Sequence, residues 1–388
     1  MDSDFDFLIV GAGFTGLVLA ERLSTQLGRS SLVVERRDHI GGNAYDYIDR
    51  VGIRVHKYGP HYFRTNSDRV VEYLSQFTQW NPVEYEVRSF TEGQFWHFPV
   101  NLNTFEQFLG RPSTSVEFEG WLRTQQVEIK SPQNSEELII SQVGWELYRK
   151  FYEGYTLKHW KRHPRELAPS VCGRIPIRTN RDNRYLSESF QALPRNGYTT
   201  MFNRLLEAAG ENVTVQLNTC FQDIRKSISF RHLIYTGPID AYFDNSLGEL
   251  PYRSLRFELE SFSPVQLEER ELEHGRPGFW QPFLQVNYPN DHEFTRIVEI
   301  KHATGQTSEH STIVREYPED FGPGKEPYYP VPTPDSAELY GRYKQLAADE
   351  EDVSFVGRMA RYRYFNMDQV VAMALKEFDR LSERYGSA

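Results

Sequence analysis

The stretch Leu8-Ile9-Val10-Gly11-Ala12-Gly13-Phe14-Thr15-Gly16 is a glycine fingerprint, and the helix-forming residues 17–23 follow it at once. Its apolar first part predicts a buried parallel strand, after which Gly11 allows a tight turn. Gly13 lets the backbone approach a pyrophosphate, and Gly16 lets the helix pack closely on the strand. A pyrophosphate at this helix N-terminus would meet unpaired N–H groups and the positive end of the helix dipole. The stretch therefore predicts a Rossmann-like unit that binds a dinucleotide.

The residues after the second predicted strand indicate which dinucleotide is bound. Strand 31–34 ends in Glu35, close to the offset at which an acid binds the adenine ribose. A second glycine pair, Gly41-Gly42, follows within a few residues. An NAD domain has no need of that pair, whereas FAD is longer and must pass more backbone. The pair therefore favours FAD.

Three later segments have the same sequence pattern as the dinucleotide-binding unit, a strand followed by a turn or a helix. Residues 213–217 alternate as a strand, and residues 233–238 form a strand that ends in a Gly-Pro turn suited to meeting a cofactor. Residues 353–358 are a strand followed by a glycine, and apolar residues within 370–381 mark one face of a closing helix. The cofactor domain is therefore expected to be discontinuous, formed by residues 1–80, 192–245 and 345–388.

Two other regions differ from the dinucleotide-binding unit in their patterns. Residues 101–170 are helical in character, because apolar residues from Leu138 to Phe151 recur about every 3.6 positions until Gly154 interrupts them. Residues 254–259 and 295–300 alternate polar and apolar side chains, as in an antiparallel sheet covered on one face. We therefore expect an α/β protein with an inserted helical domain and an antiparallel sheet domain. The sheet domain would take residues 81–100, 171–191 and 246–344, with a loop at 321–327.

Length and composition exclude several classes of protein. A chain of 388 residues exceeds the size of a single core, so two or three domains are expected. The net charge of −10 disfavours nucleic acid as a partner, because phosphate binding needs a basic face. No apolar run is long enough to span a membrane and the first residues are acidic, so we expect a cytoplasmic protein without a membrane span. Cys172 and Cys220 are expected to be a pair of buried, reduced thiols, and no metal is implied.

The middle of the chain carries a second set of motifs. Tyr155-Thr156-Leu157-Lys158-His159-Trp160 precedes residues 172–180, 183–185 and 193–198. With Gly59-Pro60-His61 before them and residues 250–255, 295–297, 326–330 and 362–364 after them, these motifs run nearly from end to end of the chain. In this order they resemble the UDP-galactopyranose mutases, flavoenzymes that interconvert UDP-galactopyranose and UDP-galactofuranose.

The resemblance implies a reaction in which the cofactor does the difficult chemistry. N5 of reduced FAD attacks the anomeric carbon and expels UDP, and the sugar opens and recloses as a furanose. NAD(P)H or another reductant would first reduce the flavin, and the substrate would be a UDP-sugar. Arg174 and Arg296 match the family's two diphosphate arginines, of which Arg174 lies on a mobile loop. They would stabilise the charge that develops on the leaving group, and His61 is the third expected catalytic residue.

The same resemblance places the remaining site residues, with residues 101–170 as the substrate domain. Aromatic residues would hold the uridine, tyrosines would donate to the phosphates, and the glycine turns would hold the cofactor. The expected substrate-binding residues are Phe151, Tyr155, Thr156, Trp160, Tyr185, Asn287, Tyr329, Tyr364 and Asn366. The expected FAD-binding residues are Gly11, Gly13, Phe14, Thr15, Gly16, Glu35, Arg36, Gly42, Asn43, His61, Gly237, Arg358 and Met367.

Three residues depart from the family pattern, so the identity of the sugar in the substrate stays open. Arg64 stands where the family usually has a second histidine, Asn366 where it has an acid, and Leu186 where it often has a phenylalanine. Loss of a carboxylate near the sugar or the phosphates removes one negative charge and adds an amide donor. A mutase for UDP-N-acetylgalactosamine, UDP-arabinopyranose or dTDP-fucose is therefore an alternative to the UDP-galactopyranose reaction.

Two further functions stay open at this point. The region from Gly11 to Asn43 alone also fits a flavin oxidoreductase of the amine-oxidase type. Such an enzyme has no reason for Arg174, Arg296 and a set of tyrosines suited to a diphosphate. A catalytically silent FAD-binding protein is the other alternative. The oligomeric state is also open, with a homo-oligomer as one option.

Overall fold

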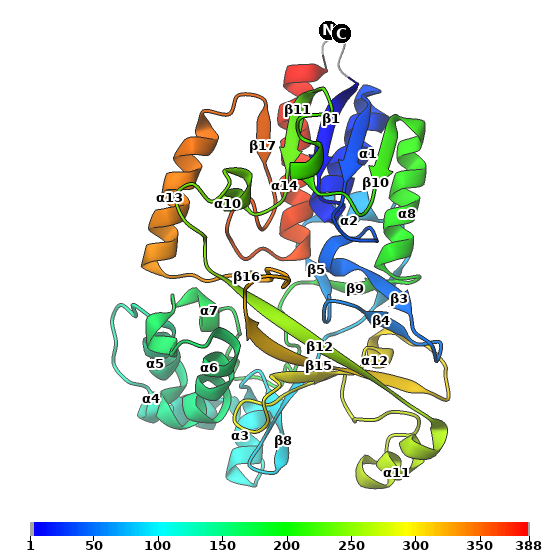
Figure 1. The fold of residues 1–388 in the computed structure, drawn as a ribbon. Coiled ribbons are helices and arrows are strands. Elements are labelled where there is room, and N and C mark those ends of the chain that lie inside the picture. Colours follow the sequence, from blue (N-terminus) through cyan, green and yellow to red (C-terminus); the bar gives the residue numbers. More distant parts are fainter. Residues whose placement is uncertain (1–3, 387–388) are drawn as a thin grey trace.

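The computed structural model describes residues 4–386, and its upper part in Figure 1 is a five-stranded parallel sheet. The strand order is β10-β2-β1-β11-β17, so the N-terminal strand lies at the centre with buried neighbours on both sides. The strands come from three separate stretches of chain, which confirms the discontinuous dinucleotide-binding fold. Their bounds are β1 Phe5–Val10, β2 Ser31–Val34, β10 Val213–Gln216, β11 Phe230–Tyr235 and β17 Val353–Phe355.

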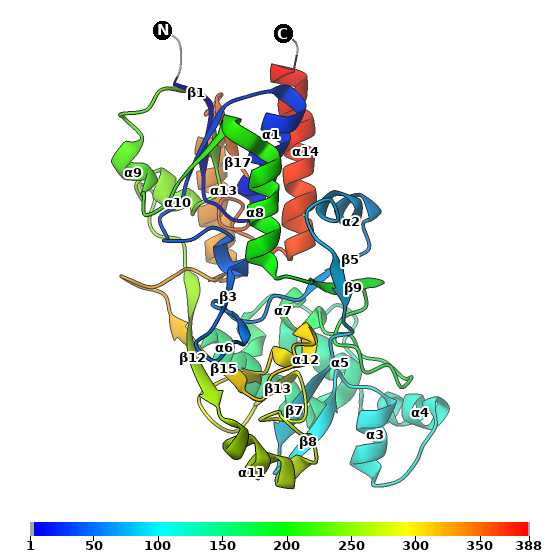
Figure 2. The same cartoon turned by 90° about the vertical axis from the view of Figure 1, so that its right-hand side faces the viewer.

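Helices cover both faces of this sheet (Figure 2). On one face, α1 packs between α8 and α14, and the apolar side chains of these helices form the largest core of the described residues. On the other face, the side chains of α9, α10 and α13 pack against the sheet in a second core. The bounds are α1 Phe14–Leu27, α8 Tyr198–Ala209, α9 Phe221–Ile224, α10 Ile239–Tyr242, α13 Pro334–Ala348 and α14 Met367–Tyr385.

The lower part of Figure 1 is built on a seven-stranded sheet of order β16-β12-β15-β14-β13-β7-β8. Its longest pair, β12 and β15, is antiparallel over ten residue pairs, as the alternating sequence predicted. One pair departs from the antiparallel prediction, because β13 runs parallel to β7. The bounds are β7 Val87–Thr91, β8 Gln94–Phe98, β12 Tyr252–Phe262, β13 Gln285–Asn287, β14 Arg296–Val298, β15 Ser311–Asp320 and β16 Tyr329–Pro330.

Smaller elements join the two parts. A three-stranded sheet, β5-β9-β6, and the hairpin of β3 and β4 lie between them, and α11 and α12 flank the seven-stranded sheet (Figure 1). The bounds are β3 Asp46–Ile48, β4 Arg54–His56, β5 Phe63–Thr65, α2 Asp68–Leu74, β6 Trp80–Pro82, β9 Phe190–Pro194, α11 Pro264–His274 and α12 Lys301–Thr304.

The predicted helical insert is present, but its break lies elsewhere. Gly154 has helical dihedral angles, whereas Gly144 has a φ of 77° inside α5 and kinks that helix. Gly154 is instead needed for close packing, because a Cβ there would lie 2.6 Å from the Pro289 carbonyl oxygen. A π-helical turn, Arg149–Glu153, links α5 to α6. The bounds are α3 Leu102–Leu109, α4 Ser115–Gln125, α5 Ser135–Tyr148, α6 Gly154–Trp160 and α7 Ser170–Gly173.

The cysteine prediction is wrong in one respect. Both thiols are free and Cys172 is buried, but Cys220 is exposed. It follows β10, whose side chains are exposed or half-buried because this strand is the edge of the parallel sheet. Within residues 4–386, no helix is both long and apolar enough to cross a bilayer.

Candidate active site

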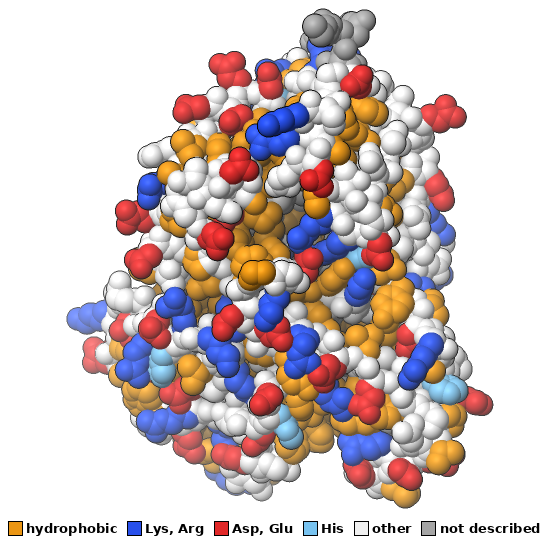
Figure 3. All heavy atoms as spheres, viewed as in Figure 1, with side chains coloured by type: hydrophobic (Ala, Val, Ile, Leu, Met, Phe, Trp, Pro, Cys, Tyr) orange, Lys and Arg blue, Asp and Glu red, His pale blue; other side chains and the backbone are white. Residues whose placement is uncertain are grey.

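A cavity of about 500 Å³ opens where β1, β2 and β11 of the parallel sheet end. All of the residues expected to bind FAD line it. Two close approaches require glycine: a Cβ on Gly16 would lie 2.0 Å from the Gly11 carbonyl oxygen, and one on Gly42 would lie 3.1 Å from the Gly13 Cα. These glycines therefore let the backbone segments that line the cavity pack closely on one another. In Figure 3 apolar and basic side chains gather around a hollow near the middle of this face.

Glu35 is held rigidly at the cavity wall. The Ala12 backbone N–H donates to its Oε2 at 2.9 Å, and the Arg37 backbone N–H donates to its Oε1 at 3.0 Å. The carboxylate is thus fixed at the end of β2, beside the glycine turn. This is the place where an acid meets the ribose of a bound dinucleotide.

The loop between β15 and β16 crosses the cavity and pairs with the dinucleotide-binding domain. Its Glu326 carboxylate is ion-paired with both Arg36 and Arg37, at 2.7 Å from the latter. Arg37 also lies over the Tyr58 ring, 4.2 Å from its centroid. Arg36 lines the cavity as expected, but its guanidinium is held by Glu326, which the sequence analysis did not single out.

His61 lines the same cavity in its neutral form. Burial, the neighbouring His56 and the charges of Arg358 and Arg296 lower its pKa to about 3. Its Nδ1 lies 2.8 Å from the Gly59 carbonyl oxygen and must donate to it, so Nε2 carries no proton. His61 is therefore suited to accepting a hydrogen bond and not to acting as an acid.

Beside the cavity lies an arginine–tyrosine cluster, which contains the two expected diphosphate arginines, Arg174 and Arg296, together with Tyr155, Tyr185, Tyr329 and Tyr364. Arg174 follows α7, and its guanidinium lies 5.0 Å from the centroid of the Tyr364 ring. Arg358, which lines the cofactor cavity, lies 5.0 Å from the centroid of the same ring. Tyr329 packs against Tyr364 with ring centroids 5.7 Å apart. Arg174 and Tyr329, expected from the sequence to bind the phosphates, therefore lie around Tyr364, beside an arginine that lines the cofactor cavity.

Arg296 is positioned by an acid that the sequence analysis missed. It lies on β14 directly opposite Glu316 on β15, and its Nε and Nη2 donate to Glu316 Oε2 at 2.9 and 2.5 Å. Glu316 is 1% exposed. Burial works against the charge of Arg296, but Glu316 and Tyr155 outweigh it and raise the arginine's pKa. A buried arginine needs a counter-ion, so an acid at a buried strand position was the available signal.

Four guanidinium groups surround Tyr364 and make it acidic. Burial raises the pKa of its phenol, but the charges of nearby arginines outweigh burial and lower the pKa to about 8. In order of their effect, these are Arg174, Arg358, Arg64 and Arg296. Burial raises the pKa of the other tyrosines of the arginine–tyrosine cluster, Tyr155, Tyr185 and Tyr329. So dense a positive field is suited to a ligand with several negative charges.

The residues expected at the uridine divide into two groups. Tyr155 and Trp160 on α6 lie at the arginine–tyrosine cluster, where the ring centroids of Trp160 and Tyr329 are 6.1 Å apart and Tyr155 acts on the pKa of Arg174. Phe151 is buried between Trp96 and Phe98 in the core of the helical insert.

Of the two polar residues considered next, one lies in the core and the other lies beside a diphosphate arginine. Thr156 is buried, and its hydroxyl lies 3.4 Å from the Cys172 sulfur. Asn287 lies opposite Arg296 in the sheet and accepts a hydrogen bond from Gln285. Thr156 therefore faces Cys172, while Asn287 is a neighbour of Arg296.

Two of the three departures from the family pattern are in direct contact. Arg64 Nη2 donates to Asn366 Oδ1 at 3.0 Å, and Arg64 Nε donates to Glu188 at 3.0 Å. Asn366 caps α14 and precedes Met367 at the cofactor cavity. Leu186, the third departure, is buried in the core of the dinucleotide-binding domain. Arg64 and Asn366 therefore act as one unit beside Tyr364.

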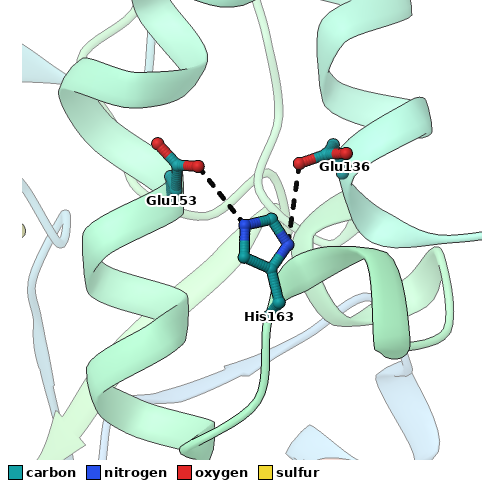
Figure 4. A group of neighbouring side chains, drawn as sticks. All are labelled: Glu136, Glu153 and His163. Carbon is teal, nitrogen blue, oxygen red and sulfur yellow. Dashed lines mark ion pairs between the residues drawn. The ribbon is translucent and has the colours of Figure 1, made fainter.

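One group of side chains, away from the cofactor cavity and the arginine–tyrosine cluster, has the composition of a metal site. His163 lies between Glu136 and Glu153, with its ring nitrogens 3.6 and 3.4 Å from their carboxylates (Figure 4). The guanidinium of Arg165 also donates to the His163 Nδ1 at 3.0 Å. A guanidinium already occupies the position that a metal would need, so we interpret the group as a polar cluster that ties α5 to the π-helical turn Arg149–Glu153.

Comparisons with known proteins agree with this geometry. The family model described as UDP-galactopyranose mutase matches residues 150–364, and that of the NAD(P)-binding Rossmann-like domain matches residues 9–77. The chain is 35% identical to a Klebsiella pneumoniae protein named "Probable UDP-galactopyranose mutase", over 96% of this chain and 94% of that protein. It is 32% identical to the dTDP-fucopyranose mutase of Escherichia coli, over 95% and 96%. The crystal structure of reduced UDP-galactopyranose mutase is similar with a TM-score of 0.75 and 17% identity, covering 98% of this chain and 96% of that one.

Proposed function

The chain belongs to the UDP-galactopyranose mutase family, and from that we propose that it is a flavin-dependent isomerase of a nucleoside diphosphate sugar. UDP-galactopyranose and UDP-galactofuranose are the proposed substrate pair. One observation carries the proposal: Arg358 lines the dinucleotide cavity and also lies beside Tyr364 in the arginine–tyrosine cluster, so a dinucleotide and a diphosphate ligand would bind next to each other. The division into three domains, at the boundaries expected from the sequence, is part of the same proposal.

FAD is the proposed cofactor. Its support is the cavity, in which Glu35 is fixed at the ribose position and the glycine turns at 11–16 and 41–42 leave room for a pyrophosphate and a long ligand. When bound and reduced, FAD would supply the nucleophilic N5 that attacks the anomeric carbon. The protein then has to bind, orient and neutralise charge. NAD(P)H is the proposed reductant.

The two diphosphate arginines, Arg174 and Arg296, would form a clamp that acts on the leaving group. As the bond between the sugar and UDP breaks, negative charge grows on the diphosphate, and Arg174 and Arg296 would bind it through charge-assisted hydrogen bonds. Glu316 fixes the orientation of Arg296, so little reorganisation is needed at that moment. Tyr155 and Trp160 would hold the base. His61 would orient groups at the cavity through its unprotonated Nε2.

The assay that tests the proposal is conversion of UDP-galactofuranose to the pyranose by the flavin-loaded protein with dithionite. An isomerase returns its electrons, so turnover should require reduced flavin and consume no stoichiometric reductant. Consumption of one reductant per turnover would favour the amine-oxidase type of function. A flavin-loaded protein that converts no nucleotide sugar would support a silent binding protein.

The contact between Arg64 and Asn366 favours a second candidate, a mutase for dTDP-fucose or a related nucleotide sugar. A dTDP-fucopyranose mutase is almost as similar to this chain as the Klebsiella protein is. Arg64 is a permanent cation that pairs with Glu188, and its other partner Asn366 carries no charge, so the site has one negative charge fewer than a site with an acid at position 366.

We expect Asn366→Asp to raise kcat/KM for UDP-galactofuranose severalfold relative to dTDP-fucose and the other candidate sugars. The new carboxylate would pair with Arg64, and aspartate caps a helix as well as asparagine does, so the fold should be kept. Initial rates on the sugar panel measure the ratio, with Asn212→Asp on the exposed surface as control. Identical ratios in the wild type and in Asn366→Asp would remove this residue from sugar selection.

Ionisation of Tyr364 should limit activity at alkaline pH. Below a pKa of about 8 its phenol is neutral and donates to the substrate, whereas above it the phenolate repels the diphosphate. We therefore expect kcat/KM to fall above about pH 8 in the wild type. Tyr364→Phe should lose this alkaline limb and be severalfold less active at pH 7, because one hydrogen bond is worth about 1 kcal/mol. The same limb in both proteins would assign it to another group.

A further inference from the structure

The cofactor cavity contains a group of ion-paired side chains at the end where the ribose of a dinucleotide would lie. Glu35, fixed at the end of β2, is followed directly by Arg36 and Arg37, and Glu326 reaches these arginines from the loop between β15 and β16. All four side chains line the cavity. The side chains of Arg36 and Glu326 are 51% and 31% exposed, so a ligand in the cavity can reach both of them.

Two arginines beside the ribose position normally favour a ligand that carries a phosphate there. In dinucleotide-binding folds, an acid at the end of the second strand binds the free 2′-hydroxyl of the ribose, whereas an arginine nearby accommodates a 2′-phosphate. This chain has both kinds of residue side by side, because Arg36 and Arg37 follow Glu35. These three residues alone are therefore compatible with either form of the ribose.

Glu326 changes this balance. Its Oε2 accepts from the Nη2 groups of both Arg36 and Arg37, at 2.7 Å from the latter. Asn43 Oδ1 accepts from the same Arg37 Nη2 at 2.9 Å, so both protons of that nitrogen are used. Two acids and two arginines leave this end of the cavity without net charge, and Glu35 would repel a 2′-phosphate directly. A 2′-phosphate therefore meets little attraction here.

The remaining cations of the cavity wall do not take over this role. Among the described residues that line the cavity, these cations are Lys325 and Arg358. Lys325 pairs with Glu319 at 2.8 Å, and Arg358 lies beside Tyr364 in the arginine–tyrosine cluster. The two arginines after Glu35 are therefore the groups that would bind a 2′-phosphate, and Glu326 is the acid that holds them.

The backbone around Glu326 is anchored by bonds that its carboxylate does not make. The Glu326 carbonyl oxygen accepts from the Ser254 hydroxyl at 2.8 Å, and the Tyr328 N–H donates to the Arg253 carbonyl oxygen at 2.9 Å. Both partners belong to β12, the long strand of the seven-stranded sheet. Replacement of the carboxylate by an amide therefore removes its charge and keeps these anchors.

We propose that Glu326 determines the nucleotide specificity of the cofactor cavity: it neutralises Arg36 and Arg37, so that a free 2′-hydroxyl is accepted and a 2′-phosphate is rejected. The inference rests on the proposed function, in which FAD occupies this cavity, and deepens it. FAD has a free 2′-hydroxyl on its adenosine ribose, whereas NADPH, one form of the proposed reductant, carries a phosphate there. Glu326 thus prevents a phosphorylated reductant from competing with the flavin.

The test measures competition with FAD, which confines the readout to the cofactor cavity. Full-length protein freed of its flavin is titrated with FAD in the presence of adenosine 5′-monophosphate or adenosine 2′,5′-bisphosphate, and flavin fluorescence reports the bound fraction. The two competitors differ only in the 2′-phosphate. The wild type should bind the monophosphate about tenfold more tightly, because the bisphosphate loses the hydrogen bond to Glu35.

Glu326→Gln should shift the ratio of the two dissociation constants about tenfold toward the bisphosphate, because it frees the two arginines for a charge-assisted hydrogen bond to the phosphate. Adding Arg36→Gln to this variant removes a cation as well and should restore most of the wild-type ratio. Glu260→Gln is the matched control, because Glu260 also pairs with an arginine but does not line the cavity. Its ratio should equal that of the wild type.

An unchanged ratio in Glu326→Gln would overturn the inference, and so would a wild type that prefers the bisphosphate. If Glu326→Gln does not rebind FAD, calorimetric titration of that variant with the two nucleotides gives the same ratio and decides. Wild-type protein that rebinds no FAD and binds neither nucleotide would instead contradict the proposed function.

Discussion

Replacement of Arg296 by alanine is expected to lower kcat about a hundredfold or more while the flavin stays bound. Loss of one preorganised contact to the charge of a transition state costs about 3–4 kcal/mol. Arg296 is held by Glu316 and aimed from a strand, and no residue of the parallel sheet depends on it. Single-turnover rates with reduced flavin measure the chemical step, and the flavin absorbance spectrum reports cofactor occupancy.

The variant leaves Glu316 buried without a partner, which alone could destabilise the protein by about 3–5 kcal/mol. The double variant Arg296→Met with Glu316→Gln removes both charges and separates the two effects. It should be stable and equally inactive. Arg315→Ala is the matched control, because Arg315 lies on the adjoining strand and pairs with Glu260 at the surface. Near-normal turnover in the double variant would eliminate the diphosphate clamp.

Gly16→Ala should abolish cofactor binding and destabilise the dinucleotide-binding domain. The new Cβ would lie 2.0 Å from the Gly11 carbonyl oxygen and 3.2 Å from Ile9, so α1 has to move away from β1. Overpacking of this kind costs about 1–3 kcal/mol, and the displaced helix N-terminus would no longer meet the pyrophosphate. We expect protein purified without flavin and a thermal midpoint lowered by about 2–3 °C, the shift that about 2 kcal/mol produces in a chain of this size.

The matched control for this variant is Gly120→Ala. Gly120 lies within α4, and a Cβ there would meet nothing within 4 Å. Alanine should therefore leave stability unchanged or raise it slightly, with the flavin retained. A yellow Gly16→Ala protein with wild-type stability would contradict the close-packing role assigned to this glycine.

The dinucleotide-binding fold could be predicted from the sequence because its signals are local. The glycine turn, the buried strands at 31–34 and 353–355, and the amphipathic closing helix each follow from a short pattern. The position of the break in the helical insert could not be predicted. Gly144 and Gly154 look alike in sequence, and the side chains and backbone that surround each of them decide which one bends the helix.

The candidate site was predictable to a similar extent. Residues inside motifs, such as Glu35 or Tyr364, were found because their neighbours in sequence define them. Glu316 and Glu326 were missed as site residues because each acts on a partner far away in the chain: Glu316 on Arg296 and Glu326 on Arg36 and Arg37. The exposure of Cys220 was missed for the same reason, since it depends on β10 being an edge strand.

The order of strands in the parallel sheet bears on how the protein is made. β1 leaves the ribosome first, but β11 and β17, which complete the sheet on its far side, follow more than half a chain later. Met367 and Val370 of α14 also line the cofactor cavity, so that cavity closes only after these residues have been synthesised. Until β11 is made, the central strand β1 can pair with β2 on one side only. Flavin loading becomes a late step of biogenesis, and a ribosome that stalls before Val353 would release a chain unable to retain the cofactor.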